Sequence, residues 1–248
     1  SCDAYRRHGC FAEYAIVPER CVYPLPDQMS FVTASLLEPL TIGLQAVRLG
    51  RAGPTTRSAV VIGAGTIGLA IIVALKAYGV QRIAAVDLDA SRLKEAMEFG
   101  ADAVFDATET TAKQLAEWGT SSADTDGADL VLEAVGAAAS VETAIHAVTR
   151  GGTVVLVGNV SPAVELPLQT VVTRQIRLQG SCASAGCYPE AIELAASGTV
   201  DLSRFVSRVA PLENGADWFE RLHNREPGIL KVVLQPSGNI EGEANVTF

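Results

Sequence analysis

Short apolar runs alternate with helical patterns through the middle of this chain. Between residues 58 and 181, runs that can form buried strands are separated by segments whose apolar residues repeat at helical spacing. Such alternation is typical of a doubly wound α/β fold, in which a parallel sheet carries helices on both faces. The six expected strands are residues 59–62, 82–86, 103–105, 130–134, 153–157 and 176–179.

The two flanks of this region have different patterns. Residues 11–25 alternate apolar and polar side chains between prolines, which predicts short antiparallel strands of a small barrel or sheet. Ser30 can cap a helix, and Pro39 predicts that a second helix starts there. Beyond residue 181 the pattern predicts a helix at 189–197, strands near 205–209 and 231–234, and a loose C-terminal tail.

A glycine motif follows the first expected strand directly. Residues 63–68 read GAGTIG and open an apolar helix. Gly63 permits a tight turn, Gly65 lets backbone approach a pyrophosphate, and Gly68 lets the helix pack closely on the strand. The free N–H groups of the helix N-terminus favour the anion. The candidate cofactor contacts here are Gly63, Gly65, Thr66, Ile67 and Gly68.

A carboxylate ends the second expected strand. Asp87 lies about twenty residues after the glycine motif, where an acidic side chain accepts hydrogen bonds from the adenosine ribose and repels a 2′-phosphate. It therefore favours NAD(H) over NADP(H), although Arg92 nearby leaves use of both open. The alternative is that Asp87 is a turn or helix-capping residue.

Two later turns belong to the same expected edge of the sheet. Val135 and Gly136 follow the fourth strand, and Val157, Gly158 and Asn159 follow the fifth. Cofactors of open α/β sheets lie outside the carboxyl ends of the strands, so these residues are candidate contacts for the nicotinamide half. The alternative is that the glycines only form turns.

Composition narrows the class of partner. The chain has 248 residues, a net charge of −9 and 48% apolar residues, with no basic patch for nucleic acid or anionic lipid. The longest apolar stretch, residues 59–75, is broken by glycines, which suits a strand, turn and helix better than a membrane span. An odd set of cysteines without disulfide spacing favours a reducing cytoplasm. They are Cys2, Cys10, Cys21, Cys182 and Cys187.

Five further segments carry a family pattern: GCFAEY at 9–14, YPLP at 23–26, LEPL at 37–40, RGGTVVLVG at 150–158 and GILKVVL at 228–234. Together with the glycine motif they resemble the medium-chain dehydrogenase/reductase superfamily, within it the zinc-type alcohol dehydrogenases of the sorbitol and threonine dehydrogenase branch. The resemblance implies a Rossmann six-stranded parallel sheet plus the remnant of a GroES-like β-barrel catalytic domain. The implied parts are residues 1–43 of that catalytic domain with a connector, the NAD(H)-binding domain at 44–181, and a return segment at 182–248.

The resemblance also implies an activity. Such enzymes transfer hydride between a secondary alcohol or polyol and NAD, while a zinc ion polarises the alcohol oxygen. Glu38 would lie beside this metal, as an occasional ligand or through water; the alternative is a surface or helix-capping role. A cytoplasmic homo-oligomer, dimer or tetramer, joined through residues 176–179 is expected by analogy.

The main zinc ligands of the family are missing from this sequence. They lie before the strand that GCFAEY resembles, and because the chain opens on Ser1 we expect that an N-terminal segment precedes it. Cys2, His8, Cys10 and Cys21 form the one cluster of candidate ligands, but their spacing is a poor match to a metal site.

Two alternatives to an active zinc enzyme stay open. The chain could bind NAD(H) as a truncated, catalytically inactive homologue. It could also be a zinc-independent enzyme similar to the NADPH-using quinone oxidoreductases, against which Asp87 and the LEPL segment argue.

Overall fold

The computed structural model describes residues 9–123, 125–184, 186–224 and 226–236. The chain divides into two compact units. One is the segment Pro39–Cys187, and the other joins Ser1–Glu38 with Tyr188–Phe248. The residues called a loose tail, and the candidate ligands Cys2 and His8, lie outside the described residues.

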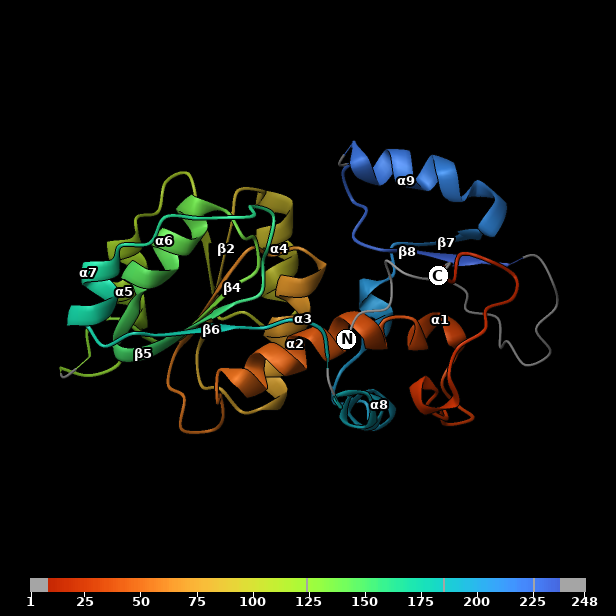
Figure 1. Ribbon diagram of the computed structural model, residues 1–248, viewed down its shortest axis with the longest axis horizontal. Coiled ribbons are helices and arrows are strands. Elements are labelled where there is room, and N and C mark those ends of the chain that lie inside the picture. The colour runs from red at the N-terminus through yellow and green to blue at the C-terminus, as the bar shows by residue number, and fades with distance from the viewer. Residues whose placement is uncertain (1–8, 124, 185, 225, 237–248) are drawn as a thin grey trace. The chain divides into compact units, whose positions relative to one another are not determined.

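The Pro39–Cys187 unit is built on a six-stranded sheet in the order β3-β2-β1-β4-β5-β6, with every neighbouring pair parallel (Figure 1). This is the order of a doubly wound dinucleotide-binding fold, which confirms the predicted fold class. The observed ends differ from the expected ones by a few residues, as hydrogen-bonding patterns cannot be read from propensity. The strands are β1 (Ala59–Ile62), β2 (Ile83–Asp87), β3 (Ala103–Asp106), β4 (Ala128–Glu133), β5 (Val148–Leu156) and β6 (Arg177–Gly180).

Helices cover both faces of this sheet. Alternate strand residues such as Val60, Val131 and Val154 pack in one core with buried residues of α5 and α6. On the other face the Cβ position of Gly68 in α3 lies 3.6 Å from Val61, and that of Gly50, after α2, lies 3.2 Å from Val155. Two covered faces explain why the strands read as continuous apolar runs. The helices are α2 (Leu37–Leu49), α3 (Thr66–Ala77), α4 (Ala90–Glu98), α5 (Ala112–Gly119), α6 (Ala138–Ala147) and α7 (Leu168–Thr173).

Polar side chains set the helix ends. Asp89 caps α4 by accepting the backbone N–H of Ser91, and Thr111 with Gln114 forms a reciprocal capping box at α5. Gly79 and Gly100 follow α3 and α4 with φ of +77° and +109°, the left-handed conformation expected at helix ends.

The second unit contains a two-stranded parallel sheet, β7 paired with β8. Leu202 and Phe205 are almost fully buried in it, and the rings of Tyr23 and Tyr188 stack at 5.1 Å. Ser30 caps α1 through the backbone N–H of Thr33, as predicted. Its elements are η2 (Glu19–Cys21), α1 (Phe31–Ala34), α8 (Tyr188–Ala196), η3 (Leu202–Phe205), β7 (Arg208–Pro211), η4 (Leu212–Asn214), α9 (Gly215–His223) and β8 (Val232–Gln235).

The prediction of antiparallel strands at residues 11–25 is wrong for this structure. These residues form irregular backbone and the short helix η2. Strands require a hydrogen-bonded neighbour, and among the described residues none pairs with this segment. Tyr14 and Ile16 are accordingly 90% and 96% exposed.

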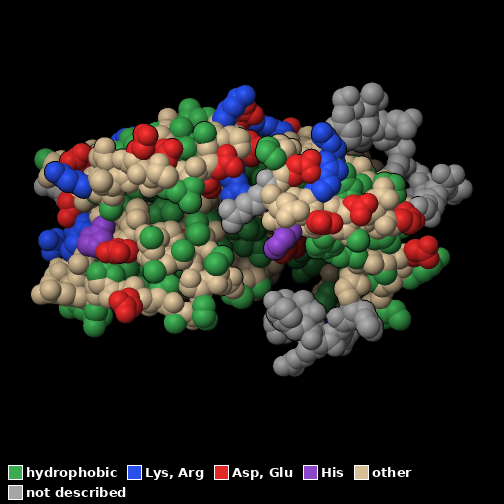
Figure 2. All heavy atoms as spheres, turned by 90° about the horizontal axis from the view of Figure 1, so that it is seen from above, with side chains coloured by type: hydrophobic (Ala, Val, Ile, Leu, Met, Phe, Trp, Pro, Cys, Tyr) green, Lys and Arg blue, Asp and Glu red, His purple; other side chains and the backbone are tan. Residues whose placement is uncertain are grey.

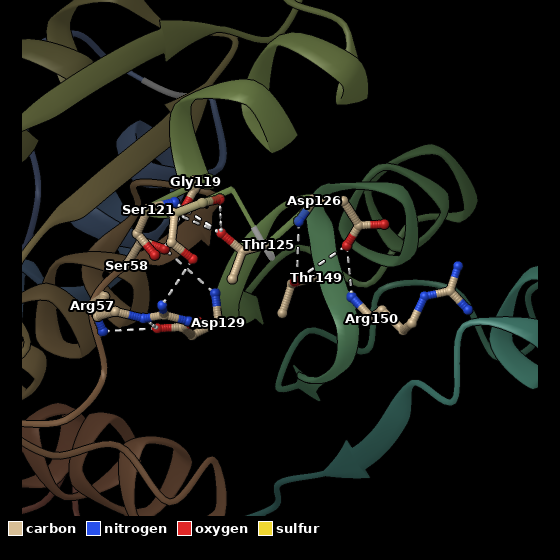
Figure 3. A network of polar contacts seen from close by, with 10 residues as sticks. Arg57, Ser58, Gly119, Ser121, Thr125, Asp126, Asp129, Thr149 and Arg150 are labelled. Atoms are coloured by element: carbon tan, nitrogen blue, oxygen red, sulfur yellow. Dashed lines mark hydrogen bonds and ion pairs between the residues drawn. The ribbon is translucent and has the colours of Figure 1, made fainter.

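A polar network ties together the amino ends of β1, β4 and β5 (Figure 3). Asp129 accepts the backbone N–H and one guanidinium N–H of Arg57, each at 2.8 Å. The buried hydroxyl of Ser58 donates to the carbonyl of Gly119 at 2.6 Å. Asp126 accepts the backbone N–H of Arg150 at 2.9 Å. This edge of the sheet is therefore held by side chains that bond to backbone.

This network makes part of the stability depend on pH. The backbone N–H of Arg150 holds the pKa of the Asp126 carboxyl below its ordinary value, assisted by the Thr149 hydroxyl and by Arg174. A lowered pKa stabilises the folded state above the pKa of the unfolded chain, near 4, and this stabilisation is lost as pH falls through the folded pKa.

Asp126→Asn is therefore expected to lower the free energy of unfolding at pH 7 by less than about 1 kcal/mol, because the carboxylate is half exposed and screened. The difference from wild type should shrink below about pH 4, as measured by urea unfolding at pH 7 and pH 3. The control is Glu117→Gln in an exposed pair with Lys113. An equal difference at both pH values would contradict the pH argument.

On the face seen in Figure 2, acidic and basic side chains are interspersed with apolar ones. Among the described residues no helix is both long and apolar enough to cross a lipid bilayer.

Candidate functional site

The glycine motif forms the turn between β1 and α3 at the carboxyl edge of the sheet. Gly63 has φ of +94°, which disfavours any side chain there. A Cβ on Gly68 would overlap the carbonyl oxygen of Gly63, so only glycine lets α3 start this close to the strand. A Cβ on Gly65 would meet no atom within 4 Å. The turn thus leaves open space beside Gly65, next to the N-terminus of α3.

The remaining motif residues begin the helix. Thr66 and Ile67 are its first two residues and are both partly exposed. Each of the three glycines is therefore explained by a different structural reason. Gly65, which has open space beside it, lies where a pyrophosphate could accept hydrogen bonds from the N–H groups of the helix N-terminus.

Asp87 ends β2 and is hydrogen bonded to the glycine turn. Its Oδ2 accepts the backbone N–H of Ala64 at 2.7 Å, and its Oδ1 accepts that of Asp89 at 3.0 Å. The Arg92 guanidinium lies 3.9 Å from Oδ2, with its side chain 44% exposed against 10% for Asp87. The two elements singled out in the sequence are therefore in direct contact, with a cation beside the carboxylate.

Asp89 adds a second negative charge to this corner. It accepts both the hydroxyl and the backbone N–H of Ser91, and these bonds, the hydroxyl foremost, hold the pKa of the Asp89 carboxyl below its ordinary value. The start of α4 therefore carries a carboxylate at neutral pH, which disfavours a further anion there.

The turns after β4 and β5 pack against each other. Gly136, with φ of +83°, would overlap the backbone of Gly158 and Asn159 if it carried a Cβ. A Cβ on Gly158 would in turn overlap the backbone of Gly136 and Val135. Val157 is partly exposed and Asn159 is exposed. All the candidate cofactor residues thus lie along the carboxyl ends of β1, β2, β4 and β5.

Glu133 belongs to this edge but was missed in the sequence. It is fully buried at the end of β4, and its carboxylate accepts the backbone N–H groups of Val135 and Gly136, each at 2.8 Å. The signal was available: a charged residue within the apolar run LVLEAVG, just before a glycine. Burying an acid in such a run is costly unless its carboxylate finds hydrogen-bond donors, which is the signal for a structural role of Glu133.

Candidate metal ligands are dispersed among the described residues. Glu38 is exposed in the first turn of α2, and Cys10, Cys21 and Cys182 are exposed and free. Cys187 is buried, with its thiol 3.5 Å from Oε1 of Gln45. Within the described ranges no three histidine, cysteine or acidic side chains come together as a metal site would require. These residues therefore do not fit a zinc centre.

Curated relatives cover most of the chain. D-xylulose reductase A of Aspergillus oryzae is 32% identical over 216 residues, which are 86% of this chain and 60% of that protein. Sorbitol dehydrogenase of Ovis aries is 35% identical over 204 residues, 80% of this chain and 55% of that protein. The chain therefore spans between 55% and 60% of the length of these relatives.

Solved structures show the same fold. A short chain alcohol dehydrogenase from E. coli CFT073, complexed with NADH, superposes with a TM-score of 0.84 at 25% identity, covering 92% of this chain and 66% of that one. Galactitol-1-phosphate dehydrogenase from Escherichia coli has a TM-score of 0.80 at 27% identity, covering 91% and 68%.

A family model described as zinc-binding dehydrogenase matches residues 66–197, just over half of the 248 residues. The match begins at the start of α3 and ends just past α8, so it includes Asp87 and the turns after β4 and β5. The two curated relatives are named as a reductase and a dehydrogenase. The chain therefore belongs to the zinc-binding dehydrogenase family, and within it is similar to sorbitol dehydrogenase and D-xylulose reductase.

Proposed function

We propose that this chain binds NAD(H) as part of a dehydrogenase that transfers hydride between a secondary alcohol or polyol and NAD. The observation that carries the proposal is the open space at Gly65 beside Asp87, whose carboxylate is bonded to the neighbouring backbone at Ala64. The relatives named for sorbitol, xylulose and galactitol 1-phosphate support a polyol as substrate. NAD supplies the hydride acceptor when bound.

Each part of the edge has a role in this proposal. The α3 N-terminus, with Gly63, Gly65, Thr66, Ile67 and Gly68, holds the pyrophosphate. Asp87 accepts hydrogen bonds from the adenosine ribose, and Arg92 balances its charge. The turns after β4 and β5 hold the nicotinamide half. The residues of those turns are Val135, Gly136, Val157, Gly158 and Asn159.

Fluorescence titration of the purified chain with NADH and NADPH tests the binding part of this proposal. We expect NADH to bind at least about tenfold more tightly than NADPH, a difference of about 1.4 kcal/mol, because Asp87 and Asp89 disfavour a 2′-phosphate. A preference for NADPH would contradict the cofactor assignment and favour the quinone oxidoreductase alternative.

A second candidate is NAD(H) binding without turnover. The observation that favours it is the dispersal of candidate zinc ligands: among the described residues no three histidine, cysteine or acidic side chains come together to hold a zinc ion that would activate an alcohol. Absorbance at 340 nm in the presence of NAD, zinc and sorbitol or xylitol separates the two. Formation of NADH supports the dehydrogenase, whereas tight NADH binding without NADH formation supports the second candidate.

Three finer features belong to the same proposal. Glu38 would lie beside the catalytic metal of the complete enzyme. Residues 44–181 would form its NAD(H)-binding domain, with 1–43 and 182–248 contributing to the catalytic domain. A cytoplasmic homo-oligomer would join through β6, which is paired on one side by β5 and forms an edge of the sheet.

A further inference from the structure

Glu133 is a buried acid whose hydrogen bonds all go to backbone. Its side chain is fully buried, Oε1 accepts the N–H groups of Val135 and Gly136, and Oε2 lies 3.0 Å from the same Gly136 nitrogen. Burying a carboxylate costs several kcal/mol unless its surroundings compensate. An apolar residue would fill the same place without this cost. We therefore attribute the presence of an acid at this position to the hydrogen bonds by which its carboxylate holds the turn after β4.

That turn contacts both neighbouring parts of the candidate site. On one side Val135 Cγ2 lies 2.8 Å from the Cβ position of Gly63 in the pyrophosphate turn. On the other side Gly136 packs directly against Gly158 and Asn159 after β5. Because the Glu133 carboxylate holds Val135 and Gly136 by their N–H groups, it fixes both contacts at once.

We propose that Glu133 is a positioning residue for the nicotinamide half of the cofactor; this rests on the proposed function. The adenosine side of the site is built by the glycine turn and Asp87, on β1 and β2. A dinucleotide in this fold extends from there across the carboxyl ends of β4 and β5. Glu133 therefore acts on one half of the ligand through the backbone of Val135 and Gly136, without touching it.

Glu133→Gln changes this arrangement with little change in volume. The amide oxygen can keep the role of Oε1, but an NH₂ group replaces Oε2 and meets the Gly136 N–H, a donor against a donor. The turn is then expected to shift, and the shift should weaken binding mainly on the nicotinamide side, because Asp87 also holds the pyrophosphate turn through the Ala64 N–H.

The experiment compares two ligands, NADH and ADP-ribose, by isothermal titration calorimetry. For Glu133→Gln we expect NADH affinity to fall about tenfold while ADP-ribose affinity stays within about twofold of wild type. Asp129→Asn is the matched control: Asp129 lies on the same strand and also accepts backbone N–H, but at the opposite end (Figure 3). It should leave the ratio of the two affinities unchanged.

The outcomes separate the two proposals. If wild type binds neither ligand, the proposed function fails, and this inference fails with it. If wild type binds both and Glu133→Gln weakens both equally, or changes neither, the positioning role alone is overturned, because a merely structural effect does not distinguish the ligands.

A measurement on wild type covers the case in which the variant does not fold. Hydrogen exchange of a peptide spanning residues 133–137 should slow more with saturating NADH than with saturating ADP-ribose, because only NADH carries the nicotinamide ring. Equal protection by the two ligands would overturn the inference.

Discussion

Gly68→Ala is expected to destabilise the protein by about 3 kcal/mol or more and to lower its melting temperature by roughly 10 °C. The added methyl group would overlap the carbonyl oxygen of Gly63, a backbone atom that no side-chain rotation can move away. Either α3 separates from β1 or the pyrophosphate turn deforms, so NADH binding should be lost as well. Thermal unfolding and NADH titration measure the two effects.

Gly65→Ala is the matched control within the same turn. Its Cβ meets nothing within 4 Å and its φ of −73° is allowed for alanine, so the melting temperature should fall by no more than about 3 °C. The methyl group nevertheless enters the space assigned to the pyrophosphate, so NADH affinity should fall at least about tenfold. Normal NADH binding by Gly65→Ala would mean that the pyrophosphate lies elsewhere.

Replacing Asp87 with asparagine should change cofactor preference by about a hundredfold, or about 2.8 kcal/mol, from NADH towards NADPH. Asparagine removes the charge that repels a 2′-phosphate and leaves Arg92 available to attract it. It keeps an oxygen that can accept the Ala64 N–H, and the Asp89 N–H that loses its acceptor is exposed to water, so stability should change little. Asp87→Ala also removes the acceptor of the Ala64 N–H, and it should lower the free energy of unfolding by about 1–3 kcal/mol more than Asp87→Asn does. Parallel titrations with NADH and NADPH measure the preference.

The control for charge is Asp102→Asn. Asp102 immediately precedes β3 and accepts the backbone N–H of Ile83, the first residue of β2, at 2.7 Å, so it is a similar carboxylate at the opposite end of β2. Its replacement should leave the ratio of NADH to NADPH affinity within about twofold, since it lies far from the carboxyl edge and water screens the charge. A similar shift in both variants would indicate a general effect of net charge.

The sheet could be predicted because its signal is local. Each strand is a short apolar run, and the helices between them carry caps such as Asp89 and terminating glycines such as Gly79. Alternation of such runs with helices predicts a doubly wound parallel sheet, whereas the order of its strands is given by the structure. Strand ends were less well predicted because they depend on which backbone groups find a neighbour, as for the register shift between Ala128 and Leu130.

The candidate site was predictable where chemistry depends on residue type and spacing, as at Gly63, Gly65, Gly68 and Asp87. Contacts between distant residues were not. Nothing local shows that the Asp87 carboxylate accepts the Ala64 N–H, or that Glu133 holds the turn that follows it. At residues 11–25 local alternation predicted strands, but pairing depends on partners that alternation does not reveal.

The mutual packing of Gly136 and Gly158 has a consequence for how such a protein can change over generations. Each glycine occupies the volume that a methyl group on the other would need, and the atoms in the way are backbone on both sides. No second substitution nearby can make room, since there is no larger side chain to shorten. The two positions are therefore expected to stay invariant together among descendants that keep these two loops, or to be lost together when one loop is rebuilt.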